Sequence, residues 1–268
     1  MASPLSEKTV IVTGAANGIG LAIARKFVKA GARVMLADID EERLLAEVDA
    51  LKDERGEAVA YAGDLRKKLA VSNLMAATVD AFDSLDILIN ASRQTGLMDP
   101  LCGDNEVFES LMHQNVTVAL RLCQAAAKRM IKLAADREPG EPIGSIVNIT
   151  SIAAERTRPE LLAYSVSTAA QNQLTRSLAV AFADKGVRVN AVALGSVMSA
   201  SLRDVCRLDD DVKDAVRAAT PLGRIAEASE AAEAALFLAS DKAAFITGQI
   251  LAVDGGRSLL DSAETPAH

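Results

Sequence analysis

Three glycines after the first apolar run could bind the phosphates of a nucleotide. The run Val10–Thr13 leads into Gly14, Gly18 and Gly20, where a helical pattern begins. Gly14 permits a tight turn, Gly18 lets the backbone approach a pyrophosphate, and Gly20 lets the helix pack closely. The start of the helix offers free N–H groups and the positive end of its dipole. The spacing differs from the general dinucleotide fingerprint, so a tight turn without a ligand is the alternative.

An acid at the end of the second apolar run strengthens the prediction of a dinucleotide site. Asp38 follows Gly20 at the distance where a carboxylate can accept both hydroxyls of an adenosine ribose. A 2′-phosphate there would face this carboxylate, and the next residues are Ile39 and Asp40 rather than an arginine. Asn17 in the glycine loop is also uncharged. The sequence therefore predicts NAD, and the alternative is that Asp38 only caps the helix beginning near Asp40.

A serine and a tyrosine mark a second place where chemistry could occur. The apolar run Ser145–Ile149 continues to Ser151, whose hydroxyl stands at the carboxyl end of a strand, the ligand edge of a parallel sheet. Tyr164 follows near the start of a helical pattern. The two histidines, His113 and His268, are too few for a His-rich metal site or an evident Ser-His-Asp hydrolase. No metal is expected.

The elements that must position these residues alternate along the chain. Strands are expected at Thr9–Thr13, Arg33–Ala37, Ala58–Ala62, Asp86–Asn90, Ser145–Ile149, Val187–Val192 and Gln249–Val253, and helices at about 18–30, 40–54, 66–83, 104–135, 160–185 and 227–240. Near-continuous Val, Ile and Leu strands indicate burial on both faces. Gly31, Gly56 and Gly186 each follow a helix directly before a strand, where a left-handed turn favours glycine.

This rhythm predicts one α/β domain over residues 1–268. Its architecture is a doubly wound parallel sheet, the Rossmann fold, with about seven strands and helices on both faces. The least regular stretch, 195–220, lies where a substrate-covering loop is expected.

The composition limits the classes of protein and partner. Hydrophobic residues make up 50% of the 268 and charged residues 24%, as in globular proteins with a sizeable core. A net charge of −7 with no Trp disfavours nucleic-acid binding. No apolar run is long enough for a transmembrane helix, and the N-terminus lacks an apolar signal core, so a cytoplasmic protein is expected. Cys102, Cys123 and Cys206 are expected to be reduced thiols.

Over about residues 7–257 the chain resembles the short-chain dehydrogenase/reductase family. The motifs that carry the resemblance are Thr13-Gly14 through Gly20, Asp64-Leu65, Asn115, Ser151 with Tyr164, Pro221–Arg224, Phe237–Ser240, Ile246–Gln249 and Asp254–Gly256. The resemblance implies an NAD-dependent oxidoreductase acting on a small alcohol or ketone. Tyr164 would be the acid/base, Ser151 would orient the substrate oxygen, and Asn115 would support a water relay.

The resemblance also implies a set of cofactor contacts and an assembly. The cofactor-binding residues would be Gly14, Asn17, Gly18, Ile19, Gly20, Asp38, Ile39, Asp64, Leu65, Asn90, Ala91, Tyr164, Gly195 and Val197. The helices over 104–135 and 160–185 would pair across a two-fold axis, with an apolar stripe at Val116, Ala119, Leu120 and Cys123. A homotetramer, or otherwise a homodimer, is expected.

The sequence departs from the family at three places. The family lysine four residues after the tyrosine, which binds the nicotinamide ribose and favours the ionised tyrosine, is Thr168 here. The family's Asn-Asn-Ala-Gly becomes Asn90–Arg93, and its Pro-Gly becomes Leu194-Gly195. Thr168 carries no charge and cannot replace the ammonium. The alternative function is therefore a catalytically impaired NAD-binding scaffold of the same fold.

Three arginines could compensate for the missing lysine. Arg93 stands beside the expected cofactor track, and Arg156 and Arg158 lie between Ser151 and Tyr164. A solvated surface position is the favoured interpretation for all three. Arg93 could instead hinder the cofactor, because it replaces a glycine where a ligand approaches the backbone.

Overall fold

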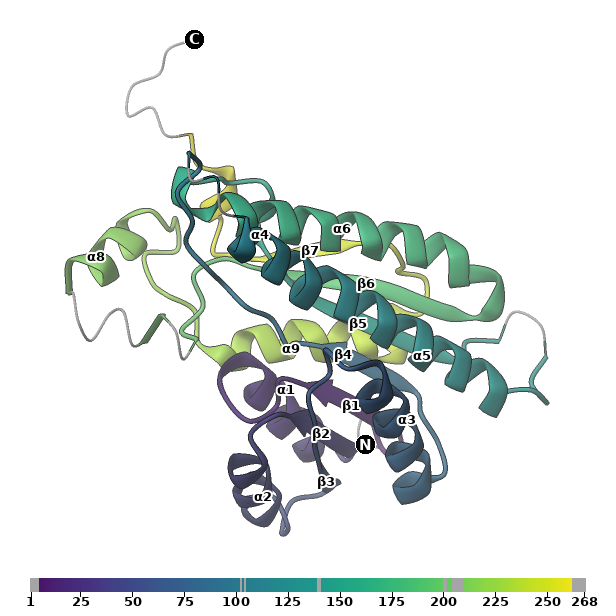
Figure 1. Cartoon of the computed structure of the whole chain (residues 1–268). Coiled ribbons are helices and arrows are strands. Elements are labelled where there is room, and N and C mark those ends of the chain that lie inside the picture. Colours follow the sequence, from purple (N-terminus) through teal and green to yellow (C-terminus); the bar gives the residue numbers. More distant parts are fainter. Residues whose placement is uncertain are drawn as a thin grey trace.

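Seven parallel strands form one sheet in the order β3-β2-β1-β4-β5-β6-β7 (Figure 1). The computed structural model describes residues 5–101, 103, 105–138, 141–199, 202–203 and 210–261. The strands are β1 (Thr9–Thr13), β2 (Arg33–Asp38), β3 (Glu57–Ala62), β4 (Ile87–Asn90), β5 (Gly144–Ser151), β6 (Val187–Leu194) and β7 (Ile250–Val253). Every predicted strand is present, with ends that differ by at most two residues. The order reverses between β1 and β4, as in the predicted Rossmann fold.

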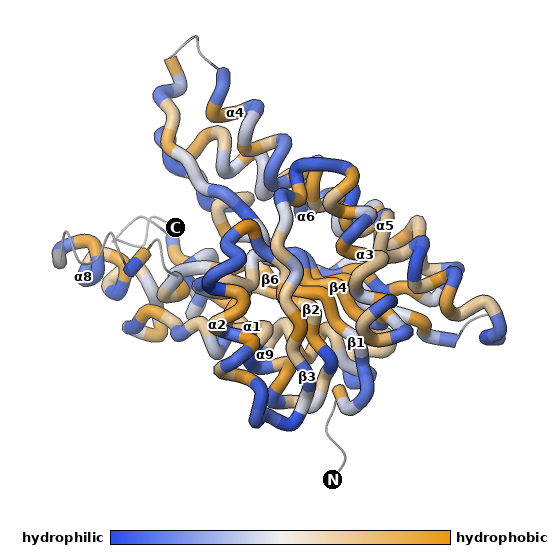
Figure 2. Tube along the Cα trace, turned by 60° about the horizontal axis from the view of Figure 1, so that its bottom comes forward, coloured by the Kyte–Doolittle hydropathy of each residue, from blue (hydrophilic) through white to orange (hydrophobic). Residues whose placement is uncertain are grey.

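Helices cover both faces of the sheet, as predicted (Figure 1). One face packs against α1 (Gly18–Lys29), α2 (Glu41–Ala50) and α9 (Ala228–Ala239), and the other packs against α3 (Lys68–Phe82), α5 (Val118–Leu133) and α6 (Leu162–Phe182). Successive side chains of a strand point to opposite faces of the sheet. Val10 and Val12 pack on the face covered by α1, and Ile11 packs on the face covered by α3. The central strands are therefore mostly apolar on both faces (Figure 2).

The helix predicted over 104–135 is interrupted. It consists of α4 (Glu106–Leu111), a π-helical turn η1 (Met112–Thr117) and α5. The wider turn carries Asn115, whose amide oxygen accepts the Gln94 N–H at 2.9 Å and whose amide nitrogen donates to the Gln94 carbonyl at 2.9 Å. The predicted stripe for pairing with a second copy is wrong in part, because Ala119 and Cys123 are buried in this chain's own core.

Two of the three predicted glycine turns have the left-handed conformation. Gly31 has a φ of 83° and Gly186 a φ of 73°. Gly56 does not have a positive φ, because α2 ends at Ala50 and not near residue 54. Gly56 instead allows a close approach, since a Cβ on it would lie 2.1 Å from the Ala32 carbonyl oxygen.

The described part of the stretch 195–220 is more regular than predicted. It contains α8 (Asp210–Ala218), and Val197 forms an isolated parallel bridge with Ala226. Cys102, Cys206 and His268 lie outside the described residues, as do positions 200–201 and 204–209.

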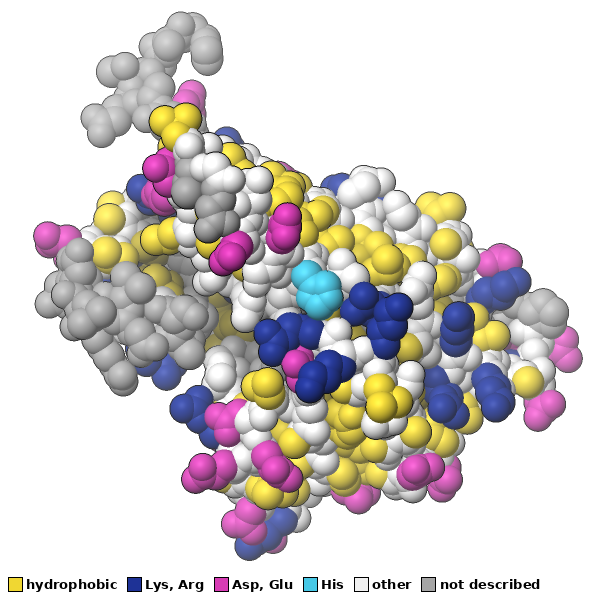
Figure 3. Space-filling view, viewed as in Figure 1, with side chains coloured by type: hydrophobic (Ala, Val, Ile, Leu, Met, Phe, Trp, Pro, Cys, Tyr) yellow, Lys and Arg dark blue, Asp and Glu magenta, His cyan; other side chains and the backbone are white. Residues whose placement is uncertain are grey.

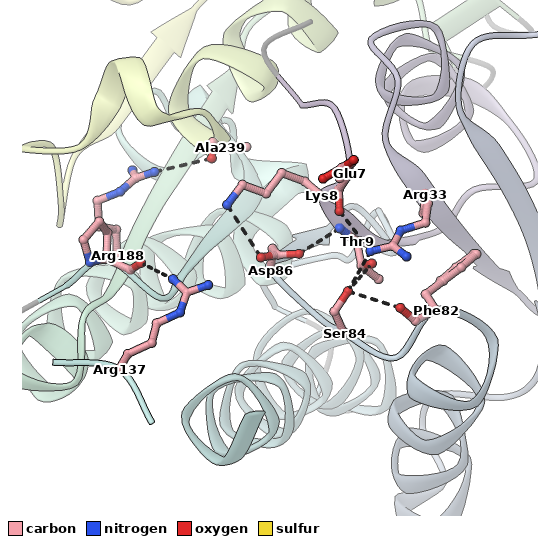
Figure 4. A network of polar contacts seen from close by, with 11 residues as sticks. Glu7, Lys8, Thr9, Arg33, Phe82, Ser84, Asp86, Arg137, Arg188 and Ala239 are labelled. Atoms are coloured by element: carbon pink, nitrogen blue, oxygen red, sulfur yellow. Dashed lines mark hydrogen bonds and ion pairs between the residues drawn. The ribbon is translucent and has the colours of Figure 1, made fainter. Parts of the chain in front are cut away.

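A polar network ties the chain together at the amino ends of the strands, opposite the ligand edge (Figure 4). The Asp86 carboxylate accepts the Thr9 N–H at 2.9 Å and lies 3.6 Å from the Lys8 ammonium. The Ser84 hydroxyl lies 2.6 Å from the Thr9 hydroxyl and accepts a bond from the Arg33 guanidinium at 3.1 Å. These contacts fix the starts of β1, β2 and β4 relative to one another.

The surface charge is unevenly distributed. On the face in Figure 3, Lys and Arg side chains gather over the region of α3 and α5, while Asp and Glu lie mostly around α2 and near α4. Among the described helices, none is long and apolar enough to cross a membrane. The described His, Cys, Asp and Glu side chains form no group of three that could hold a metal ion.

Candidate active site

A cavity of about 560 Å³ lies at the carboxyl ends of β1, β2, β3 and β4. Ten of the predicted cofactor-binding residues line it: Gly14, Asn17, Gly18, Ile19, Gly20, Asp38, Ile39, Asp64, Leu65 and Ala91. The carboxyl edge where the strand order reverses is the ligand site of doubly wound sheets. The glycine loop and the acid after β2 thus share one concave surface.

The glycine loop has the geometry that its sequence predicts. Gly14 has a φ of 67° and Gly18 a φ of 57°. A Cβ on Gly14 would lie 2.9 Å from the Ser92 backbone, and one on Gly20 would lie 2.1 Å from the Gly14 carbonyl oxygen. Because α1 begins at Gly18, the N–H groups of its first turn have no partner within the helix. The loop therefore offers donors to an anionic group in the cavity.

Asp38 is held by the loops around the cavity and does not cap α2. Its carboxylate accepts the backbone N–H groups of Ala16 at 3.1 Å and Ile39 at 2.7 Å. The N-cap of α2 is Asp40, whose side chain accepts the Arg43 N–H at 3.1 Å. The alternative interpretation of Asp38 as a helix cap is therefore wrong.

An arginine that the sequence reasoning missed borders the same cavity. Arg66 donates two hydrogen bonds to the Asp64 carboxylate, at 2.8 and 3.0 Å. These bonds hold the pKa of Asp64 below its usual value. The signal in the sequence was an arginine two residues after the predicted acid, at the start of the segment leading into α3.

The segment after β4 is attached to the end of β1. The Thr13 hydroxyl accepts the backbone N–H groups of Ala91 and Ser92, both at 3.1 Å. Ser92 also accepts a hydrogen bond from the Gln114 amide at 3.1 Å. This segment brings further lining residues that the sequence reasoning did not name, including Ser92, Gln94 and Thr95.

Asn90 belongs to a buried network and does not line the cavity. Its amide nitrogen donates to Asn148 at 2.8 Å and lies 3.2 Å from the Cys123 sulfur. Asn148 in turn donates to the Thr175 hydroxyl at 2.9 Å. Burial raises the pKa of the Cys123 thiol to about 12. This network crosslinks β4, β5, α5 and α6 beneath the site.

Two further predicted cofactor contacts lie outside the cavity lining. A Cβ on Gly195 would lie 2.3 Å from the Asp254 Cβ, so this glycine allows β6 to pack against the end of β7. Val197 is engaged in its bridge with Ala226. Ser199, two residues further on, does line the cavity.

Ser151 is linked through Ala153 to the apolar cluster that contains Tyr164. Ser151 ends β5, and its hydroxyl accepts the Ala153 N–H at 3.1 Å at the start of the short turn η2 (Ile152–Ala154). Tyr164 lies in the first turn of α6 and is 5% exposed. Ala153 and Tyr164 pack in the same apolar cluster as Leu111 and Ala163. The sequence prediction that these two hydroxyl residues share a site is consistent with this packing.

Arg93 connects the cavity to Tyr164, which corrects the expectation of a solvated arginine. Its side chain lines the cavity, and its guanidinium donates a hydrogen bond to the Tyr164 hydroxyl. The guanidinium carbon lies 5.9 Å from the ring centroid. Arg156 instead donates to the Ser258 carbonyl at 2.7 Å, and Arg158 forms an exposed ion pair with Glu160 at 3.0 Å. Of these three arginines, Arg93 is the one that contacts Tyr164.

The polar groups of Thr168 and Asn115 are both bonded to other parts of the chain. Thr168 is 0% exposed, and its hydroxyl donates to the carbonyls of Tyr164 at 3.0 Å and Ser165 at 3.1 Å. The Asn115 amide nitrogen donates to the Ser167 hydroxyl at 3.0 Å as well as to Gln94. Thr168 thus offers the site neither a charge nor a spare donor.

Known proteins resemble this chain over nearly its full length. A family model described as enoyl-(acyl carrier protein) reductase matches residues 14–258. Cis-4-hydroxycyclohexanecarboxylate dehydrogenase of Sinomonas cyclohexanicum is 36% identical over 259 residues, covering 96% of this chain and 98% of that protein.

Solved structures give the same result. A short-chain type dehydrogenase/reductase from Mycobacterium ulcerans matches with a TM-score of 0.87 at 28% identity, over 95% of this chain and 91% of that one. A 7α-hydroxysteroid dehydrogenase in complex with NADH and 7-oxo glycochenodeoxycholic acid matches with a TM-score of 0.86 at 32% identity, over 94% of each chain. The family model begins within the glycine loop, and the matched structures cover 94–95% of this chain.

Proposed function

Because the chain belongs to the short-chain dehydrogenase/reductase family of oxidoreductases, we propose that it transfers a hydride between NAD(H) and an alcohol or carbonyl substrate. The observation that carries this proposal is the cavity itself. One end has the glycine loop and Asp38, and at the other Arg93 contacts the Tyr164 hydroxyl. A nicotinamide cofactor would supply the hydride donor or acceptor when bound.

The residues of the cavity fit a dinucleotide with an unphosphorylated ribose. The first-turn N–H groups of α1 suit its pyrophosphate, since they lack partners within the helix. The Asp38 carboxylate suits the ribose hydroxyls and disfavours a 2′-phosphate by charge repulsion. The matched dehydrogenase structure contains NADH, which supports the assignment of NAD.

Tyr164 and Ser151 have the chemistry that the substrate oxygen requires. In the oxidation direction the ionised oxygen of Tyr164 takes the proton of the alcohol O–H, and the substrate carbon loses a hydride, which a bound nicotinamide would accept, so that a carbonyl forms. In reduction the Tyr164 hydroxyl returns the proton to the oxygen. Ser151 orients this oxygen by hydrogen bonding. The proposed role of Asn115 is to support a water relay, and its contacts with the Gln94 backbone and the Ser167 hydroxyl hold its amide in place.

A catalytically impaired NAD-binding scaffold is the second candidate. The observation that favours it is Thr168, which stands where the family has its lysine and is bonded to its own helix. Such a protein would bind NADH in the cavity without turning over an alcohol or ketone.

The remaining features of the proposal concern the whole chain. We infer one domain over 1–268, with the region 195–220 covering the substrate, because Ser199 lines the cavity. We infer a homotetramer, or otherwise a homodimer, located in the cytoplasm.

Calorimetric titration with NADH, followed by a screen of alcohols with NAD and of ketones with NADH, tests the function. Binding together with turnover of a small alcohol or ketone supports the oxidoreductase. Binding without turnover across a broad substrate panel supports the scaffold. No binding of either NADH or NADPH would contradict both.

A further inference from the structure

We propose that Arg93 supplies the positive charge that assists ionisation of Tyr164, in the place of the absent lysine. The inference rests on the proposed function for its catalytic consequence, but the contact itself stands independently. Arg93 lies in the segment after β4 and Tyr164 in the first turn of α6, and the folded chain places the guanidinium against the phenol oxygen. Arg93 is thus a positioning residue that acts through Tyr164.

The residues around Tyr164 leave the Arg93 guanidinium as the main electrostatic influence on its hydroxyl. The side chains that pack on its ring are apolar: Leu111, Ala153 and Ala163, with Met98, Phe108 and Leu161 around them. Acids on the neighbouring segments, Glu109, Glu155 and Glu160, are exposed, and Glu160 is paired with Arg158. Among the described residues, Arg93 is therefore the charged side chain in contact with the phenol.

The position of Arg93 suits a cation that stays charged. An arginine keeps its proton at any pH at which a tyrosine titrates, so it favours the anionic phenol oxygen throughout. An opposite charge in direct contact favours the ionised form of an acid, and the surrounding apolar side chains reduce screening by water. A lysine four residues after the tyrosine would act from the same helix, whereas Arg93 acts from the facing loop.

The composition of the chain provides a direct measurement. It has two tyrosines and no tryptophan, so the near-ultraviolet absorbance of the phenolate reports on Tyr61 and Tyr164 alone. Burial raises the pKa of Tyr61, whose hydroxyl donates to the Ala70 carbonyl at 2.8 Å. The Tyr61→Phe protein therefore gives an absorbance titration of Tyr164 only.

In the Tyr61→Phe background, Arg93→Gln is expected to move the phenolate absorbance change to higher pH, because the cation that contacts the phenol oxygen is removed. Arg93→Lys keeps a charge and is expected to retain most of the parental titration. Arg158→Gln is the matched control, because it removes an arginine that pairs with Glu160 on the surface. Coincident titrations of the parent and Arg93→Gln would overturn the proposal.

Kinetics and binding distinguish this inference from the function on which it rests. Arg93→Gln is expected to lower kcat about tenfold or more while NADH affinity changes less than about threefold, and to shift the pH–rate profile with the absorbance titration. Tighter NADH binding with faster turnover would show that Arg93 obstructs the cavity, and would overturn the proposal. An absorbance shift in a protein without any turnover would contradict the oxidoreductase function and leave the Arg93–Tyr164 pair supported.

Discussion

The carboxylate of Asp38, at the end of β2, accepts the backbone N–H of Ala16 in the glycine loop at 3.1 Å. The acid and the phosphate-binding loop are thereby fixed relative to each other. A second N–H, from Ile39 at 2.7 Å, holds the other carboxylate oxygen. The negative charge consequently has a fixed position in the cavity, and a ligand must accommodate it.

We expect NADH to bind about tenfold or more tightly than NADPH, and Asp38→Ala to narrow that difference. The reason is repulsion between the carboxylate and a 2′-phosphate in a partly desolvated site. Calorimetry with both cofactors measures it. The control variant Glu42→Ala also removes one negative charge, but from the exposed start of α2. It should leave the ratio of the NADH and NADPH affinities unchanged. Equal affinities of the parent protein for the two cofactors would contradict the assignment of NAD.

Acid stability is expected to depend on Asp254. Burial opposes its charge, yet hydrogen bonds from Ser258 at 2.8 Å and Gly256 at 2.9 Å hold its pKa below the usual value. A lowered folded-state pKa contributes stability above the unfolded value near about 4, and this contribution is lost as the pH falls through the folded value. Asp254→Asn should therefore lower the free energy of unfolding by about 1–2 kcal/mol at neutral pH.

Urea unfolding measures the free energy of unfolding of the parent and of Asp254→Asn, at neutral pH and below about pH 4. The difference between the two proteins should shrink in acid. A difference that stays constant or grows as the pH falls would show that the Asp254 carboxylate is not stabilised by its two donors.

The Cys123 thiol should be unreactive in the folded protein. It is buried, and its raised pKa of about 12 leaves almost no thiolate at neutral pH. In a Cys102→Ser, Cys206→Ser protein, intact mass should show no maleimide adduct under native conditions and one adduct in denaturant. Rapid labelling of the folded variant would contradict this burial.

The sequence predicted the sheet well because its signals are local. Each strand is a short Val, Ile and Leu run next to a helical pattern. The predicted and observed ends of β1 are therefore the same, Thr9 and Thr13. The interruption at Asn115 had no such signal, since it depends on a contact with Gln94 from a distant loop. The sequence predicted Gly56 as a helix cap. A glycine is needed there because the Ala32 backbone approaches it closely, and this contact exists only in the folded chain.

The sequence predicted the parts of the candidate site in which the residue type itself restricts the backbone conformation or the charge. A positive φ at Gly14 and a carboxylate at Asp38 follow from the motif and its spacing. The sequence named Arg93 as one of three arginines that could replace the lysine but could not choose among them, because its position depends on the loop that Thr13 holds at the end of β1. The motif also misled in one case. It predicted Asn90 as a cofactor contact, whereas the Asn90 side chain bonds Asn148 in a buried network.

A tetramer is expected, and two exposed apolar side chains are candidates for its interfaces. Val180 on α6 is 82% exposed, and Phe245, next to the edge strand β7, is fully exposed. Two isologous interfaces give a closed assembly of four chains, each of 28.1 kDa. Light scattering should report a tetramer for the parent and smaller species for Val180→Glu and for Phe245→Glu. Leu69→Glu, on α3, is the control that should remain tetrameric, and a monomeric parent would contradict the expectation.

Thr168→Lys tests whether an ammonium on α6 and the guanidinium of Arg93 supply the same charge to Tyr164. Residues 164 and 168 lie one turn apart on the same helix face, so a lysine there can reach the phenol oxygen. With Arg93 present, a second cation adds little, and we expect kcat to change by less than about threefold. In the Arg93→Gln protein the same lysine should restore about tenfold or more of the lost turnover. Independent, additive effects of the two substitutions, or loss of a robust parental activity in Thr168→Lys alone, would show that the two cations do not act on the same oxygen.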